Sequence, residues 1–303
     1  MRAWTFLYLQ DMRITAPPSF NFKNTILSHG WCELLPFRID EDRFELSYVL
    51  DPGTGVNPID ILLREAAGKI EIDVAGSKPD GGEAQLGRNS AAHVLRLDED
   101  LNGFYKVTSE EAGLEWIAKR GAGRLLRSPT VFEDLVKTIC TTNCSWALTK
   151  SMVGNLVEKL GKPSAAGGSS FPTPGAMASV DELFYRDEIR AGYRGPYLAE
   201  LARRVDSGDL DPESWLASTL PTNELKKEIL GVKGAGNYAA ENLLKLLGRY
   251  DGLALDSFLR SEFYKKHRAG TACSDKEIEA HYERFGCWRG LVIWCEMSKR
   301  WLV

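Results

Sequence analysis

Two glycines and one aspartate in the second half of the sequence have the types and spacing to act on a phosphate-bearing substrate. Gly234 and Gly236 form a tight turn between two segments of helical pattern. Such a turn points backbone N–H groups outward at the start of the second helix, which makes a phosphate site that needs no side-chain charge. Lys233 adds a positive charge at the rim of the turn, and Asn237 follows its second glycine.

The aspartate, Asp256, stands about twenty residues further on, in the stretch Leu-Asp-Ser-Phe at 255–258. Both features also have plain structural interpretations. A glycine pair can merely close a hairpin of two helices. An aspartate before an apolar helix is a good N-cap. A cap and a functional carboxylate can be the same residue, so the two interpretations of Asp256 are compatible.

A glycine hairpin followed at this spacing by Asp256 resembles the helix–hairpin–helix DNA glycosylases, in which the acidic residue stands in a Val-Asp-x-His-like setting. The resemblance implies that Asp256 is the catalytic carboxylate. Breaking an N-glycosidic bond leaves an oxocarbenium-like sugar, so a fixed carboxylate beside C1′ stabilises charge that exists mainly in the transition state. The start of a helix favours a negative charge, and the carboxylate would also orient the attacking water.

Two longer motifs extend the resemblance over about residues 110–300. Residues 124–146 look like the opening of the glycosylase domain in the 8-oxoguanine glycosylases, and Asn143 matches the asparagine that fills the space left by a flipped base. Residues 282–291 are similar to a closing motif found in both the alkylpurine and the 8-oxoguanine branches. Asn143 could equally be a helix cap or kink residue.

The tripeptide Gly-Tyr-Arg at 192–194 resembles a motif of the 8-oxoguanine branch. There the tyrosine wedges into the duplex and the arginine reads the orphaned base, roles that fall on Tyr193 and Arg194. An enzyme that extrudes a base must stabilise the gap, so a wedge and a gap-filling polar group are mechanical needs. The alternatives are a half-buried turn tyrosine and an ordinary surface charge.

The sequence departs from the family pattern at Tyr238. Bifunctional members carry a lysine two residues after the second hairpin glycine, and its amine attacks C1′ to form a Schiff base. With tyrosine in that place, β-lyase activity by this route is not expected. An aromatic residue there is similar to the monofunctional alkylpurine glycosylases, whose pockets hold cationic bases by cation–π attraction. Trp31 and Trp294 are candidate walls of such a pocket, with core packing as the alternative for both.

The positions that grip the oxidised base in the 8-oxoguanine branch give mixed indications. A glutamine and a phenylalanine of that branch fall near Ile293 and Met297, which cannot make the same contacts. Met297 nevertheless remains a candidate pocket residue. Gly30, in a weaker match at residues 28–31, corresponds to a glycine whose carbonyl senses the oxidised ring. Gly30 therefore favours the oxidised-purine branch, whereas Ile293 and Met297 oppose it.

Two kinds of structure must position these residues. Residues 20–107 are rich in strand patterns, such as 44–50 and 70–74, with one helix expected at about 58–67. Later segments have a helical period, and the expected helices are 132–140, 147–160, 180–190, 195–206, 212–219 and 222–230. Residues 162–170, rich in glycine and serine, are expected to form a flexible surface loop.

The sequence therefore predicts an α+β fold. A small N-terminal antiparallel-sheet domain is assigned to residues 1–110, and an all-helical helix–hairpin–helix glycosylase domain to residues 111–303. The composition of the 303 residues, 44% hydrophobic and 26% charged, excludes a disordered chain, a collagen and a coiled coil.

Charge and cysteine content limit the possible partners and cofactors. The net charge of −4 divides into 11 basic and 18 acidic residues over 1–111, against 27 and 24 over 112–303. DNA is therefore expected to meet the second part. Six cysteines without a CxxC pair indicate reduced thiols. We expect no cofactor and no metal held by side chains, although an ion could sit at the hairpin carbonyls of Leu230 and Val232.

These features predict a monofunctional base-excision-repair DNA glycosylase that hydrolyses the N-glycosidic bond of a flipped, damaged, alkylated purine. It would act as a monomer on double-stranded DNA. Two alternatives stay open. One is an 8-oxoguanine-type glycosylase with lyase activity borrowed from another lysine, such as Lys233. The other is a non-catalytic protein that binds abasic or distorted DNA.

The apolar runs are too short to cross a membrane. The apolar N-terminal segment 1–9 lacks a small-residue cleavage site. We therefore expect no membrane partner, and a protein that is cytoplasmic and nucleoid-associated, or nuclear, and not secreted.

Overall fold

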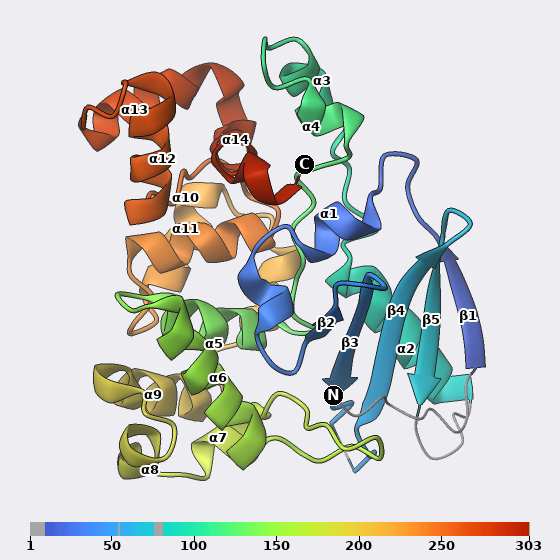
Figure 1. The fold of residues 1–303 in the computed structure, drawn as a ribbon. Helices are drawn as coiled ribbons and strands as arrows, with labels where there is room; N and C mark the ends of the chain where they lie inside the picture. The colour runs from blue at the N-terminus through green and yellow to red at the C-terminus, as the bar shows by residue number, and fades with distance from the viewer. Residues whose placement is uncertain (1–9, 54, 76–80, 303) are drawn as a thin grey trace.

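The computed structural model describes residues 10–53, 55–75 and 81–302. A five-stranded antiparallel sheet near the N-terminus is followed by helices, which confirms the predicted α+β fold (Figure 1). The expectation about residues 1–9 lies outside the described residues. The strand order is β1-β5-β4-β3-β2, and the strands are β1 (Gln10–Thr15), β2 (Arg38–Asp40), β3 (Glu45–Leu50), β4 (Ile59–Ala66) and β5 (Lys69–Ala75).

Helices form most of the rest of the chain. The α-helices are α1 (Phe22–Ile26), α2 (Gly81–Val94), α3 (Asn102–Ser109), α4 (Trp116–Lys119), α5 (Val131–Thr141), α6 (Trp146–Leu160), α7 (Pro174–Ala178), α8 (Glu182–Asp187), α9 (Gly195–Asp206), α10 (Thr222–Leu230), α11 (Asn237–Leu246), α12 (Ser257–His267), α13 (Asp275–Tyr282) and α14 (Arg289–Leu302). Short 3₁₀-helices are η1 (Gly30–Glu33), η2 (Gly192–Arg194), η3 (Pro212–Ala217) and η4 (Glu283–Trp288).

The centre of the sheet is held by alternating apolar residues of β4 and β5. The antiparallel register pairs Ile61 with Val74 and Leu63 with Ile72, and all four side chains are fully buried. Helix α2 lies against the sheet in contact with β1, β4 and β5 (Figure 1). Since successive side chains of a strand point to opposite faces, this alternation fixes which face of the sheet joins the core.

The prediction of a helix at 58–67 is wrong, because this segment forms strand β4. Its buried apolar residues recur at every second position, which is the period of a strand. The turn that follows carries positive φ at both Ala67 and Gly68. Two such residues are typical of a type I′ hairpin turn, so β4 returns directly as β5. The Ala-Gly pair was the local signal that would have favoured a hairpin.

The segment 162–170 is also not the free loop that its composition predicts. Pro163 and Ser169 form an antiparallel bridge across it. Ser164 Oγ donates to Asp60 Oδ1 at 2.7 Å, and Ala166 N donates to the other oxygen at 3.3 Å. Asp60 is a fully buried carboxylate in β4, and a buried carboxylate must be hydrogen-bonded. The loop therefore fastens the helices to the sheet.

The helices expected between 132 and 230 are largely confirmed. Helices α5, α6, α9 and α10 lie at their predicted positions, α8 is shorter than expected, and 212–217 is a 3₁₀-helix. Local capping explains several of the boundaries. The Thr130 side chain accepts from Glu133 N at the start of α5, and the Ser145 side chain accepts from Leu148 N at the start of α6.

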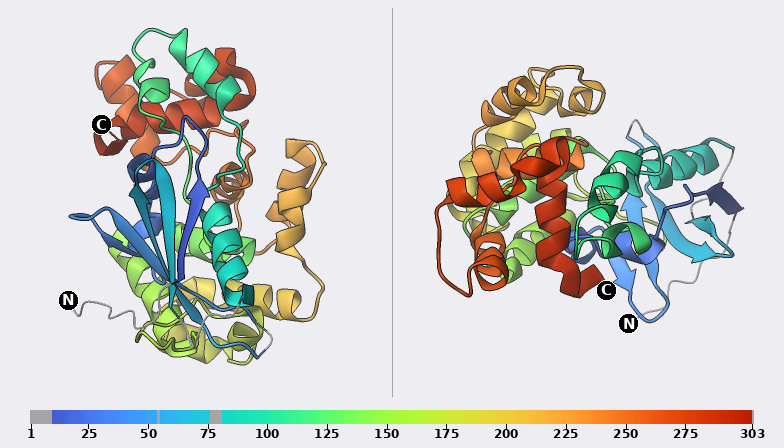
Figure 2. Two further views of the ribbon diagram at one scale, coloured as in Figure 1. Left: turned by 90° about the vertical axis from the view of Figure 1, so that its right-hand side faces the viewer. Right: turned by 90° about the horizontal axis from the view of Figure 1, so that it is seen from above.

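The sheet and the helices share one hydrophobic core, which runs from Met12 to Leu302. Helix α1 and the 3₁₀-helix η1 lie between the sheet and the helical layer (Figures 1 and 2). Phe104 of α3 packs on Trp288 of η4 with ring centroids 5.7 Å apart. The division at 110/111 thus remains an interpretation, because α3 contacts the C-terminal helices. No described helix combines the length and apolar character needed to cross a membrane.

Candidate active site

A cavity of about 1250 Å³ opens where η1, the glycine hairpin and the start of α12 meet. Aromatic side chains from segments far apart in the sequence line it: Trp31, Trp146, Tyr193, Tyr197, Tyr238, Phe258, Trp294 and Trp301. The acidic, basic and histidine side chains of its described lining are His29, Glu33, Glu41, Lys245, Asp256 and Arg260. The volume exceeds the roughly 300–1,000 Å³ of a small-molecule pocket, so the cavity can receive a nucleotide with its sugar.

The glycine hairpin forms as the sequence predicts, with α11 starting at Asn237 after the N-cap Gly236. Gly234 adopts a φ of +89°, and a Cβ there would lie 2.9 Å from the Tyr197 ring. The first amides of a helix have no partner within the helix, and Gly236 brings no side-chain cap. Gly234, Gly236 and Asn237 all line the cavity. Unpartnered amides at the start of a helix can hold a phosphate, and this role of the turn stays a prediction.

Replacing Gly234 by alanine should weaken DNA binding and lower stability. A side chain at positive φ costs about 1–2 kcal/mol, and the new Cβ would push the turn away from Tyr197. Binding to a duplex with an abasic-site analogue and the thermal midpoint check this. Gly154→Ala in α6 is the matched control, because nothing lies within 4 Å of its Cβ position. Wild-type affinity in Gly234→Ala would contradict a role of the turn in binding.

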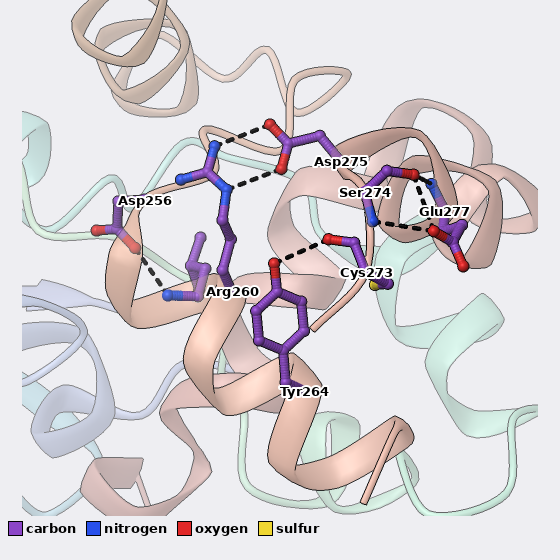
Figure 3. Close-up of polar contacts among 8 residues, drawn as sticks. Asp256, Arg260, Tyr264, Cys273, Ser274, Asp275 and Glu277 are labelled. Atoms are coloured by element: carbon purple, nitrogen blue, oxygen red, sulfur yellow. Dashed lines mark hydrogen bonds and ion pairs between the residues drawn. The ribbon is translucent and has the colours of Figure 1, made fainter. Parts of the chain in front are cut away.

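Asp256 lies at the cavity as the N-cap of α12. One carboxylate oxygen accepts from Leu259 N at 2.7 Å. Figure 3 shows the second oxygen pointing away from this bond. The side chain is half-buried. The capping and functional interpretations of Asp256 are thus geometrically compatible, since one oxygen caps the helix while the other faces outward.

Arg260, one turn after Asp256, is fixed by a bidentate ion pair. Its Nε and Nη2 donate to the two oxygens of Asp275 at 2.8 and 2.9 Å (Figure 3). Asp275 begins α13, whose N-cap Ser274 forms a capping box with Glu277. Bidentate pairs of this kind are geometrically specific. They place a guanidinium at the cavity beside the candidate catalytic carboxylate.

Tyr238 lines the same cavity as Asp256. Burial, reinforced by the negative charge of Asp256, raises the pKa of the Tyr238 hydroxyl to about 12. The phenol therefore stays neutral at physiological pH. Since position 238 carries no amine, it offers no nucleophile for a Schiff base.

Trp31 and Trp294, which were predicted to form the pocket walls, both line the cavity. The indole N–H group of each donates a hydrogen bond. Trp31 Nε1 donates to the buried Asp134 at 2.7 Å, and Trp294 Nε1 donates to Ser28 O at 2.9 Å. Their rings are therefore held in place and offer apolar surface to a ligand. Met297 is buried and does not line the cavity. Its assignment to the base pocket therefore stays a prediction, which the cavity lining does not support.

Gly30 lies at the cavity under the indole of Trp146. A Cβ at position 30 would overlap this ring. Trp146 Nε1 donates to Glu33 Oε2 at 3.0 Å, and Lys150 pairs with the same oxygen. The glycine thus allows an aromatic wall to close over the backbone of η1.

Asn143 lines the cavity from the turn between α5 and α6, and Tyr193 lines it from η2. Asn143 has a φ of +47°, between α5 and α6, and Tyr193 is 53% exposed. Both are therefore accessible to a duplex. Arg194, by contrast, is buried and does not line the cavity. Its Nη2 donates to Thr142 O and its guanidinium stacks over the Tyr193 ring. We therefore correct its assignment: Arg194 ties the tyrosine to the Asn143 loop.

The lysine that the cavity contains differs from the one the sequence suggested. Lys233 is exposed, pairs with Glu200 at 2.5 Å and lies outside the cavity lining. Lys245 is instead the lysine among the described lining residues. Burial lowers its pKa to about 8, while Glu241 and Asp256 oppose this shift. Lys245 lies seven residues after Tyr238, on the same face of α11, and this spacing was the signal that could have found it.

Several other lining residues have no signal in the sequence. Phe258 and Trp301 stack with ring centroids 5.0 Å apart, and Trp146 also lines the cavity. Trp301 reaches the cavity only because α14 packs against α12. Single aromatic residues are common in cores, so only their position in the fold distinguishes them.

Metal ligands do not cluster in the part of the chain that the structure describes: no three His, Cys, Asp or Glu side chains are placed to share an ion. The ion suggested at the carbonyls of Leu230 and Val232 stays a prediction. The Val232 carbonyl accepts from Ala235 N at 3.0 Å.

Two partly buried histidines should make the fold acid-sensitive. Burial lowers the pKa of His29, at the cavity, and of His93, on α2, to about 4. The unfolded chain would take up these protons near pH 6.5. Between pH 6.5 and 4 it therefore binds more protons than the folded chain, and stability falls as the pH falls, by up to about 3 kcal/mol for each histidine.

Urea denaturation at pH 7 and pH 5 measures this loss. His29→Gln should reduce the loss, because the amide stays neutral and can still donate to Leu126 O, which the ring nitrogen of His29 contacts at 2.8 Å. An unchanged pH dependence in this variant would exclude His29 as a cause.

Comparison by sequence matches no protein family and no curated protein. Solved structures are similar over almost the whole chain. MBOgg1, solved with a low-affinity DNA ligand, has a TM-score of 0.75 at 19% identity, over 97% of this chain and 98% of that one. The 3-methyladenine DNA glycosylase of Archaeoglobus fulgidus has a TM-score of 0.75 at 18% identity, over 95% and 98%.

The 8-oxoguanine glycosylase/lyase of Clostridium acetobutylicum, in its apo form, has a TM-score of 0.73 at 19% identity, over 98% of this chain and 99% of that one. These identities are low, and the agreement is one of architecture. The chain therefore has, from the N-terminal sheet to the last helix, the fold of 8-oxoguanine and 3-methyladenine DNA glycosylases.

Proposed function

We propose that this protein is a DNA glycosylase that removes a damaged purine by hydrolysis, with Asp256 as the catalytic carboxylate. The observation that carries the proposal is the meeting of Asp256, the hairpin amides and an aromatic-lined cavity at one place. The amides would hold the DNA backbone, and the cavity would receive the flipped base. The carboxylate would stabilise the oxocarbenium-like sugar and orient water toward C1′.

We further propose that the substrate is an alkylated purine and that no strand cleavage follows. Two features support this choice. The aromatic walls present electron-rich faces, which attract cationic alkylated bases. Tyr238 supplies no amine for a Schiff base. The solved structures of this fold include a 3-methyladenine DNA glycosylase.

A second candidate is an oxidised-purine glycosylase with lyase activity. It is favoured by Gly30 at the cavity wall and by the 8-oxoguanine glycosylase/lyase among the structures of this fold. Lys233 is a poor source of the amine, because it lies outside the cavity lining and is paired with Glu200. The third possibility is a protein that binds abasic DNA without chemistry.

A panel of duplexes, each bearing one lesion, distinguishes these functions. Each duplex is incubated with the protein and analysed with and without alkali. Base release that needs alkali to give strand breaks supports the hydrolytic function, and breaks without alkali support the lyase. Tight binding to abasic DNA with no release from any duplex would overturn both enzymatic proposals.

A further inference from the structure

The segment that ends at Asp256 has no regular secondary structure of its own. It connects α11 to α12 across residues 247–256. Within it Ala254 is buried and adopts a φ of +52°. A residue with a Cβ is strained in this backbone region, and the conformation persists only where the surroundings hold it. Something must therefore fix the backbone two residues before the carboxylate.

Two side chains of α11 hold one peptide unit in this segment. Ala254 N donates to Glu241 Oε2 at 2.6 Å, and Lys245 Nζ donates to Leu253 O at 2.9 Å. The Leu253 carbonyl and the Ala254 amide belong to the same peptide bond. Glu241 and Lys245 are four residues apart and so lie on the same side of the helix. Together they hydrogen-bond to both polar atoms of that peptide unit.

Other contacts fix the side chains of Glu241 and Lys245 in turn. Lys226 of α10 pairs with the other Glu241 oxygen at 2.6 Å. Lys245 is 3% exposed, so its hydrogen bond to the Leu253 carbonyl is made away from water. Hydrogen bonds with a charged partner are short and strong. Upstream, Tyr250 O accepts from Gly290 N at 2.8 Å, which fixes the beginning of the segment to α14.

We propose that Glu241 and Lys245 are positioning residues. Their hydrogen bonds to the Leu253–Ala254 peptide unit fix the left-handed backbone at Ala254, and this backbone sets the position of the Asp256 carboxylate in the cavity. This inference rests on the proposed role of Asp256. It gives the buried lysine of the cavity a structural task. Its Nζ already donates to a carbonyl, so it is not poised to attack a sugar.

The test compares base release with DNA binding in variants of the full chain. Single-turnover release is measured on a duplex that the wild type processes, and affinity on a duplex with an abasic-site analogue. Glu241→Ala and Lys245→Met should each slow release by about 100-fold, the cost of a carboxylate displaced by about 1 Å, with affinity nearly unchanged. Glu241→Gln keeps an acceptor for Ala254 N and should recover most of the rate.

Glu262 and Lys265 supply the matched control, since they form an ion pair at 2.7 Å within α12 without touching this segment. Lys265→Met and Glu262→Ala should release base at the wild-type rate. An equal loss of release rate in the control and test variants would show that the loss is not specific to the segment before Asp256, and this would count against the inference. Wild-type rates in both Glu241→Ala and Lys245→Met would overturn the inference.

The pH profile adds a measurement that a merely structural role would not move. The groups facing Lys245 are Glu241 on its own helix, Asp256 before α12 and Cys295 on α14. Burial raises the pKa of Cys295 to about 12, so this thiol stays neutral. The wild-type release rate should fall as the pH rises through about 8, where Lys245 loses its charge. Lys245→Met should lack this fall, and a fall that persists would count against the inference.

Two further outcomes keep this inference separate from the proposed function. An adduct that borohydride traps in the wild type and not in Lys245→Met would assign the lysine to chemistry and overturn the positioning role. If no duplex is processed at all, the proposed function fails. A crystal structure of Glu241→Ala then decides the inference, which is overturned if Ala254 and Asp256 keep their places.

Discussion

Asp256→Asn should reduce base release by about 1,000-fold or more, which is the scale of losing a group that stabilises transition-state charge. The variant loses the negative charge that the proposed function places beside C1′. It should keep its fold, because asparagine is as good an N-cap as aspartate and can still accept from Leu259 N, now bonded at 2.7 Å. Single-turnover release and binding to an abasic-site duplex measure the two properties separately.

Asp181→Asn is the matched control. Asp181 caps α8 in the same way, accepting from Phe184 N at 2.8 Å, and it is exposed and outside the cavity lining. It should release base at the wild-type rate. Unchanged turnover in Asp256→Asn would remove the basis of the proposed chemistry.

Tyr238→Lys should give the protein lyase activity. Position 238 lines the same cavity as Asp256, and the charge of Asp256 acts on the present hydroxyl. An amine there would be a nucleophile beside the carboxylate. Borohydride should trap a covalent protein–DNA adduct with Tyr238→Lys and none with the wild type, and strand breaks should appear without alkali.

The double variant Tyr238→Lys/Asp256→Asn tests whether the new amine works through the proposed site. It should form no adduct on a duplex with an intact damaged base, because base release would still need the carboxylate. An adduct of equal yield in the double variant would show that Asp256 is dispensable. An adduct with the wild type would instead favour the lyase candidate.

The fold could be predicted largely from the sequence because its signals are local. The period of apolar residues marks α5 and α6, and the spacing of two glycines marks the hairpin before α11. The wrong prediction of a helix where β4 forms also arises from the use of local signals. A short, mostly apolar run such as 59–63 fits a buried strand or a helix equally well, and the deciding information is its pairing with β5.

The candidate site was predictable only in part. Asp256, Tyr238 and Asn143 line the cavity, as their places in the sequence motifs suggested. Met297 and Arg194 do not, because each turns toward the interior. Helical position alone could not show that Met297 packs into the core, nor that Arg194 bonds to Thr142.

What the sequence by itself determined is the α+β class, the hairpin and the capped aspartate, all of which depend on neighbours within a few residues. The tertiary structure alone decided which side chains wall the cavity and which lysine reaches it. Trp146 and Trp301 lie far apart in the chain, and Lys245 grips a peptide bond beyond the end of its own helix. Such contacts arise from the packing of whole elements, which no local pattern records.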